Sequence, residues 1–78
     1  MFDVNYLLEK AISETHNLNV GETFLVKDLF KGYEWNRIPR KTRLLLGTLF
    51  LNAVSTDHNL NIDVFEKTSS NQQKYKKK

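Results

Sequence analysis

The feature that most constrains the fold is a change in hydrophobic period along the chain. Residues 3–18 and 39–54 repeat their apolar side chains at helical spacing, whereas from Leu60 onward apolar and polar positions alternate. A period near 3.6 is typical of a helix with one buried face, and a period of two is typical of a half-buried strand. A chain of 78 residues in which helices precede strands is expected to form one α+β domain.

The first helical stretch places its apolar residues on one face, because they follow the spacing i, i+3, i+4, i+7, i+8. These residues are Val4, Leu7, Leu8, Ala11, Ile12 and Thr15. Asp3 is expected to cap the helix, since its carboxylate can accept N–H groups that lack a helical partner. Asn17 and Asn19 are expected to end the helix, and Gly21 to turn the chain.

The second helical stretch is the longest, and Pro39 suits its first turn because a proline there loses no hydrogen bond. Its expected core positions are Leu46, Leu49, Phe50, Ala53 and Val54. The residues expected on its outer side are Arg37, Arg40, Lys41, Leu44, Thr48 and Leu51. Gly47 costs about 1 kcal/mol relative to alanine in a helix, so we expect another helix or a ligand backbone to approach closely there.

The shorter segments complete the pattern. Residues 23–26 form a β-prone run, and residues 27–32 are expected to make one or two helical turns that Gly32 ends. Residues 33–36 are then a connection. Residues 60–65 predict a strand and residues 68–71 a turn. Residues 72–76 return as a second strand, with Tyr75 facing away from Lys74 and Lys76.

The predicted order is helix, short strand, short helix, long helix, β-hairpin. This is the order of a winged helix-turn-helix domain, in which the short and long helices form the helix-turn-helix and the hairpin forms the wing. The domain is expected to span residues 1–78, with residues 76–78 frayed, and residues 23–26 are expected to pair with the hairpin as a third strand.

The segment Phe24–Trp35, followed by Ile38-Pro39 and Arg43–Gly47, resembles a small bacterial family known as a domain of unknown function. The resemblance covers about residues 21–54, and its Asp-Leu-Phe-x-Gly-x-x-Trp block is fairly specific. The chain looks like the member carried by staphylococcal cassette chromosome elements. That likeness implies a winged-helix fold and single-stranded DNA binding beside an element-encoded replication machinery. The family often has glycine at the position of Lys41, where this chain adds a charge.

Charge is distributed unequally. Residues 1–34 carry three lysines and six acids, whereas residues 35–78 carry nine basic residues and three acids. Cations neutralise phosphates, and aromatic rings stack on unpaired bases, so the basic half predicts binding of single-stranded DNA. The predicted nucleic-acid-binding residues are Trp35, Arg37, Arg40, Lys41, Arg43, Lys67, Lys74, Tyr75, Lys76 and Lys77.

These residues also have simpler interpretations. Trp35 can cap the core over Phe30, Arg43 can pair with Asp28 or Glu34, and the C-terminal lysines can be a solubilising tail. The apolar outer positions of the long helix suit a protein partner, such as a replication enzyme, or a dimer. A regulator that binds duplex DNA is a further alternative, although the first two turns after Pro39 lack the Asn or Gln that reads adenine.

Other functions are not expected. The chain has no cysteine and only two histidines, far apart in the sequence, so we expect neither a metal site nor a cofactor. It has no Gly-rich phosphate loop and no His–carboxylate grouping on one element, so we do not expect an enzyme. We also expect no membrane-spanning segment and no secretory signal, and therefore a cytoplasmic location.

Overall fold

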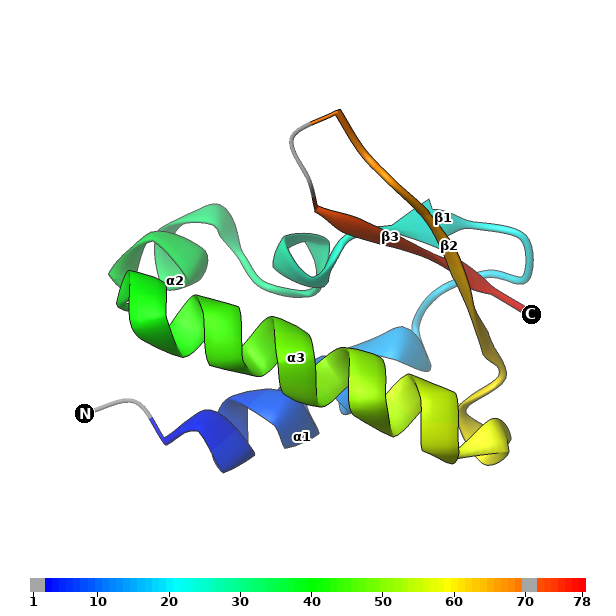
Figure 1. Cartoon of the computed structure of the whole chain (residues 1–78), viewed down its shortest axis with the longest axis horizontal. Helices are drawn as coiled ribbons and strands as arrows, with labels where there is room; N and C mark the ends of the chain where they lie inside the picture. The colour runs from blue at the N-terminus through cyan, green and yellow to red at the C-terminus, as the bar shows by residue number, and fades with distance from the viewer. Residues whose placement is uncertain (1–2, 70–71) are drawn as a thin grey trace.

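The computed structural model describes residues 3–69 and 72–78, and within them the chain has the expected α+β architecture (Figure 1). Three α-helices are joined to a three-stranded antiparallel sheet of order β1-β3-β2. The elements are α1 (Val4–Thr15), β1 (Thr23–Phe24), η1 (Val26–Leu29), α2 (Gly32–Arg37), α3 (Arg40–Thr56), η2 (His58–Leu60), β2 (Ile62–Lys67) and β3 (Gln73–Lys77), where η marks a 3₁₀-helix. The hairpin turn was predicted at residues 68–71, of which Ser70 and Asn71 lie outside the described residues.

The first helix forms as its sequence pattern predicts. Asp3 caps it, because its carboxylate accepts the N–H of Asn5 at 2.9 Å. Leu7, Ala11 and Thr15 are buried on one face. The helix ends at Thr15, slightly before the predicted end, and this buried face packs against α3.

Helix α2 differs from the prediction. Gly32 does not end a helix; it begins α2, which includes the residues 33–36 that the sequence assigned to a connection. The physical reason is capping from within the chain, since the Glu34 carboxylate accepts the Lys31 N–H at 3.3 Å. The preceding segment forms the shorter η1, in which Asp28 accepts the Leu25 N–H at 2.9 Å.

The long helix α3 supplies the centre of the core. Of the five predicted core positions, Leu46, Phe50 and Val54 are buried, and Phe50 is completely inaccessible to solvent, whereas Leu49 and Ala53 are only half-buried. Pro39 precedes the helix as its N-cap, so Arg37 lies on α2 and not on the long helix. The helix packs against α1 on one side and β2 on another.

The sheet is built on its central strand, β3. Phe24 of β1 pairs with Tyr75, and Val64 of β2 pairs with Tyr75 from the other side. Residues 76–78 are paired and not frayed, because the Lys77 N–H donates to the Glu22 carbonyl and the Lys78 N–H to the Asn61 carbonyl, both at 2.8 Å. The predicted pairing of the first strand with the hairpin is therefore confirmed.

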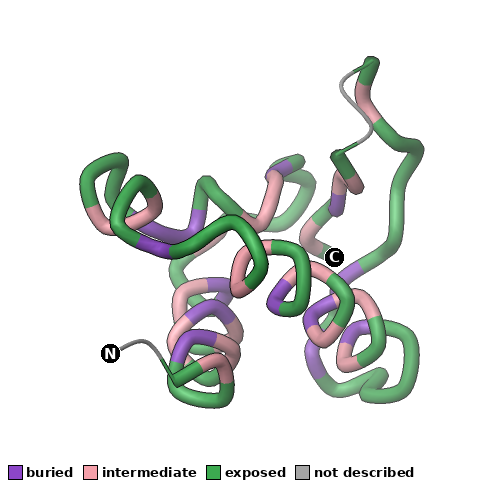
Figure 2. Tube along the Cα trace, turned by 60° about the vertical axis from the view of Figure 1, so that its left-hand side comes forward, coloured by how far each residue is buried: buried purple, intermediate pink, exposed green. Residues whose placement is uncertain are grey.

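The outer part of the hairpin projects from the body of the domain (Figure 2). Ile62 at its base is buried, whereas Val64 and Phe65 are more than 40% exposed. The predicted strand is confirmed, but its alternation of buried and exposed residues stops where the strand leaves the core. Within residues 3–69 and 72–78, no helix combines the length and the hydropathy needed to cross a bilayer.

Candidate functional site

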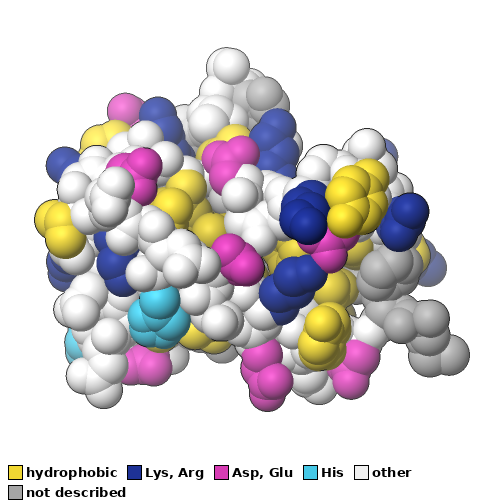
Figure 3. All heavy atoms as spheres, turned by 180° about the vertical axis from the view of Figure 1, so that it is seen from behind, with side chains coloured by type: hydrophobic (Ala, Val, Ile, Leu, Met, Phe, Trp, Pro, Cys, Tyr) yellow, Lys and Arg dark blue, Asp and Glu magenta, His cyan; other side chains and the backbone are white. Residues whose placement is uncertain are grey.

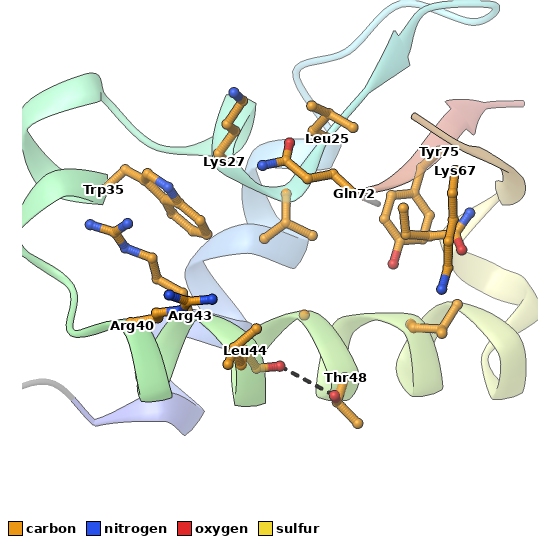
Figure 4. A pocket seen from close by; sticks show the side chains of 14 residues that line it. Leu25, Lys27, Trp35, Arg40, Arg43, Leu44, Thr48, Lys67, Gln72 and Tyr75 are labelled. Atoms are coloured by element: carbon orange, nitrogen blue, oxygen red, sulfur yellow. Dashed lines mark hydrogen bonds between the residues drawn. The ribbon is translucent and has the colours of Figure 1, made fainter. Parts of the chain in front are cut away.

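A groove of about 670 Å³ lies between α3, the segment around η1 and the β2–β3 hairpin (Figure 4). Its floor on α3 is formed by residues at helical spacing, which are Arg40, Leu44, Gly47, Thr48 and Leu51. This is a different stripe from the one that faces the core. The sequence pattern predicts that Arg40, Leu44, Thr48 and Leu51 share an outer side of the helix. All four line the groove, and Arg40, Leu44 and Thr48 are exposed, but Leu51 is half-buried and also packs against the core.

The charged residues of the groove all have one sign. The described residues that line it include four cations, Lys27, Arg40, Arg43 and Lys67, and no carboxylate. Arg40 and Arg43 lie with Trp35 at one end, and Lys67 lies at the other end beside Tyr75 (Figure 4). Leu25, Leu44, the Thr48 hydroxyl, the Gln72 amide and Lys27 lie between these two ends (Figure 4). This arrangement attracts an anion at both ends of the groove, and Leu44, Gly47, Thr48 and Leu51 form an uncharged part of the floor between those ends.

Trp35 is part of the groove, but its ring is already engaged. Phe30 packs against it with ring centroids 5.7 Å apart, and the Arg43 guanidinium lies 5.4 Å from the ring centroid. The predicted cap over Phe30 is therefore confirmed. Stacking of a base on Trp35 would require Arg43 to move, so we do not include Trp35 as a stacking platform in the proposed site.

Arg43 holds the junction between α2 and α3. Its Nε donates to the Ile38 carbonyl at 2.8 Å and its Nη2 to the Asn36 carbonyl at 3.3 Å. A cation is favourable here because the carbonyls at the end of α2 carry partial negative charge. The alternative pairing with Asp28 or Glu34 is wrong. Because Arg43 is bound to backbone groups, its substitution would disturb the fold as well as the charge of the groove.

Glu34 is paired elsewhere. Its carboxylate accepts a hydrogen bond from the Lys10 ammonium at 2.5 Å, which links α2 to α1. That bond lowers the pKa of Glu34, with smaller contributions from the Lys31 N–H and from the charges of Lys10 and Lys31, and burial opposes the shift. The same bond raises the pKa of Lys10. The pair thus holds the Glu34 carboxylate toward α1, and Glu34 is not among the residues that line the groove.

Tyr75 is a core residue. Its ring is 1% exposed, stacks on Phe24 at 5.6 Å and meets Phe50 edge to face at 5.0 Å. The sequence correctly placed it opposite Lys74 and Lys76, but the buried face leaves no room for a base. Burial raises the pKa of its phenol to about 12.

This burial predicts a loss of stability at high pH. Between pH 10 and 12 the unfolded chain ionises Tyr75 whereas the folded chain does not, so the free energy of unfolding falls as the pH rises through this window. Tyr75→Phe should make the midpoint of thermal unfolding, followed by circular dichroism, less sensitive to pH over that range. If the unfolding midpoint fell equally with pH in the unaltered protein and in Tyr75→Phe, the Tyr75 phenol would be accessible to solvent in the folded protein.

The remaining predicted binding residues lie outside the groove. Arg37 stacks on the Tyr33 ring at 5.0 Å and borders a hollow of about 270 Å³ between α1 and α2. Lys41 is exposed near the start of α3. Lys74 and Lys76 project from the opposite side of β3 to Tyr75, and Lys77 pairs with Ile62 near the base of the hairpin. The ten predicted residues therefore do not form one site.

The polar groove residues Lys27, Gln72 and Gln73 were absent from the predicted site, as were Leu25 and Val26. Lys27 lies in the acidic half of the sequence, and Gln72 and Gln73 lie in the hairpin, so neither charge counts nor helical spacing singles them out. Gln73 is partly structural, because its side-chain amide donates to the Phe65 and Lys74 carbonyls. Only the folded chain brings these residues opposite α3.

The face seen from behind in Figure 3 has a different character from the groove. Basic and acidic side chains are interspersed over it and do not form a field of one sign. The described residues also contain no group of three or more His, Asp or Glu side chains that could hold a metal ion. The groove is therefore the strongest candidate site that the described part of the chain offers.

One family model matches residues 9–77, and its description is "Domain of unknown function (DUF1413)". The matched range contains every residue that lines the groove. Comparisons with curated proteins and with solved structures gave no significant match.

Proposed function

The chain belongs to the family described as a domain of unknown function, DUF1413, and we propose that it is a winged-helix protein that binds single-stranded DNA. The strand would lie in the groove between α3 and the β2–β3 hairpin and would be bound with little preference for sequence. Replication of a mobile element is the biological setting that the staphylococcal resemblance implies.

The topology supports the winged-helix part of the proposal. The elements follow the order α1, β1, α2, α3, β2, β3, and the sheet has the order β1-β3-β2. In a winged helix the helix after the turn forms the binding face and a β-hairpin stands beside it as the wing. Here α3 and the projecting hairpin form the two sides of the groove.

The observation that carries the proposal is a groove that the described residues line with four cations, no carboxylate and, on α3 between Arg40 and Lys67, the leucines Leu44 and Leu51. Cations at both ends can contact successive phosphates and release their counterions. Leu25, Leu44 and Leu51 can cover base faces, which are exposed only in a single strand. Duplex DNA is less well matched, since the middle of the α3 side presents Leu44, Gly47 and Leu51, and this side carries no Asn or Gln to read adenine. Arg43 on the same side is already bound to backbone carbonyls.

Binding of oligo-dT, followed by the fluorescence of Trp35, tests the proposal. Trp35 is the single tryptophan and lines the groove, so its emission should change when a strand enters. If all four cations contact phosphates, the logarithm of the binding constant should fall with the logarithm of salt with a slope of about −3, or roughly fiftyfold between 50 and 200 mM salt. Absence of binding at low salt, or binding that salt does not change, would contradict the proposal.

A second candidate is a protein-interaction module. Leu44 is 64% exposed and Leu45 is 48% exposed, so adjacent leucines at the start of α3 are left without cover within the described chain. Exposed apolar patches are typical of interfaces. The same titration separates the candidates, because an interaction module would leave the tryptophan signal unchanged on addition of oligo-dT. A regulator that binds duplex DNA would bind the duplex more tightly than the single strand.

A further inference from the structure

We propose that Gly47 is the position at which a nucleobase lies with its face against the backbone of α3, between Leu44 and Leu51. This inference rests on the proposed function and makes it more specific, because it assigns the base contact to one residue. It also assigns the type of contact, which is packing of a base face and not hydrogen bonding to a base edge.

The fold itself gives no reason for a glycine at this position. Gly47 lies inside the 17-residue helix α3, where glycine is about 1 kcal/mol less favourable than alanine. Its φ is not positive, since the only glycine with positive φ among the described residues is Gly21. Apart from its two chain neighbours and the adjacent backbone of α3, a Cβ built on Gly47 would have no atom within 4 Å. Neither backbone conformation nor internal packing therefore requires the missing side chain.

The expected close approach of another helix is thus wrong, and a ligand remains as the reason for the glycine. Gly47 lines the groove midway along its floor, with Leu44 three residues before it and Leu51 four residues after it on the same stripe. A strand that runs from the Arg40 end to the Lys67 end would run along the side of α3 that lines the groove (Figure 4), and Gly47 belongs to that side. Without a side chain, the helix leaves space for a flat group between the two leucines.

Thr48, the polar residue next to Gly47 on the floor, is not available to donate a hydrogen bond to a base edge. The Thr48 hydroxyl donates to the Leu44 carbonyl at 3.2 Å, so its proton is already used within the helix. The α3 floor around Gly47 therefore offers apolar contact and no free side-chain donor among Leu44, Thr48 and Leu51. All bases have a flat face, so a contact of this kind accepts any of them.

Gly47→Leu and Gly47→Ala test the assignment, with Asn52→Leu as the matched control on an exposed part of α3 outside the groove. Gly47→Leu should weaken oligo-dT binding about tenfold or more, because the side chain occupies the space of the base. It should leave the salt slope unchanged, since the phosphate contacts remain. Gly47→Ala should weaken binding by about threefold and raise the unfolding midpoint by about 4–8 °C. Asn52→Leu should bind as the unaltered protein does.

The outcomes separate the two proposals. If the unaltered protein binds and both Gly47 variants bind equally well, the groove function stands and the assignment of Gly47 is overturned. If Gly47→Leu does not fold, Gly47→Ala alone decides, and an affinity equal to that of the unaltered protein overturns the assignment. If the unaltered protein does not bind oligo-dT, the proposed function and this inference fail together.

Discussion

Replacement of Phe50 by alanine is expected to cost about 3–5 kcal/mol of the free energy of unfolding, which is typical of a buried phenylalanine. Phe50 is fully buried and meets the rings of Phe24 and Tyr75 edge to face, at centroid distances of 6.4 and 5.0 Å. It therefore joins α3 to both β1 and β3. A cavity at this point would separate the helix from the sheet as well as remove apolar contact.

The expected loss is large relative to the stability of such a small domain. A chain of 78 residues is stable by roughly 4–12 kcal/mol in total, at about 0.05–0.15 kcal/mol per residue. The midpoint of thermal unfolding should fall by at least about 12 °C, or the protein should be unfolded at room temperature. Circular dichroism and urea unfolding measure the effect.

Phe65→Ala is the matched control, because it makes the same chemical change on the projecting hairpin. Phe65 is 42% exposed, so its loss should cost less than about 1 kcal/mol. The two variants should therefore differ by several kcal/mol. Equal losses would mean that the hairpin is packed as firmly as the core, or that Phe50 is not at its centre.

Much of this fold follows from patterns that are local in the sequence. The spacing of Leu7, Ala11 and Thr15 identifies the buried face of α1, and Asp3 marks its start. The alternation of apolar and polar residues identifies the strand that begins at Ile62. The position of Tyr75 between two lysines identifies the buried face of β3. These features are predictable because a helix or strand must turn its apolar side to the core whatever its neighbours are.

The boundaries of α2 were not predictable from propensity alone. Glycine is common just after a helix, so Gly32 by itself predicts the end of one. The competing signal was Glu34, whose carboxylate caps the Lys31 N–H and allows a helix to begin at Gly32. An acidic residue at the third helical position is a start signal that the sequence already contained. The shift also moved Arg37 from the long helix to α2.

Only the α3 side of the groove could be predicted from the sequence. Helical spacing correctly put Arg40, Leu44 and Thr48 on a common outer side of α3. It could not show that Lys27 and Lys67 lie across from that side, because their positions depend on tertiary contacts between segments 40 residues apart in the sequence. Charge counts also favoured the C-terminal lysines, most of which belong to the other face of the sheet.

This division of the lysines leads to the prediction with the largest expected effect on binding. Arg40→Ala combined with Lys67→Ala removes one cation from each end of the groove, and both residues are exposed. Oligo-dT binding should weaken by about thirtyfold at low salt, from a loss of about 1 kcal/mol for each phosphate contact. The salt slope should become shallower by about 1.4, because two phosphate contacts contribute about 0.7 each on a single strand.

Lys74→Ala combined with Lys76→Ala is the matched control, since it removes the same charge from the opposite face of β3. If the strand is bound only through the net charge of the protein, both double variants should lose the same affinity. If it lies in the groove, the Arg40/Lys67 double variant should lose much more. The affinity for oligo-dT and its dependence on salt, measured for both double variants under conditions in which both are folded, distinguish these cases. A larger effect from Lys74 and Lys76 would move the binding site from the groove to the outer face of the sheet, and it would remove the role proposed for α3.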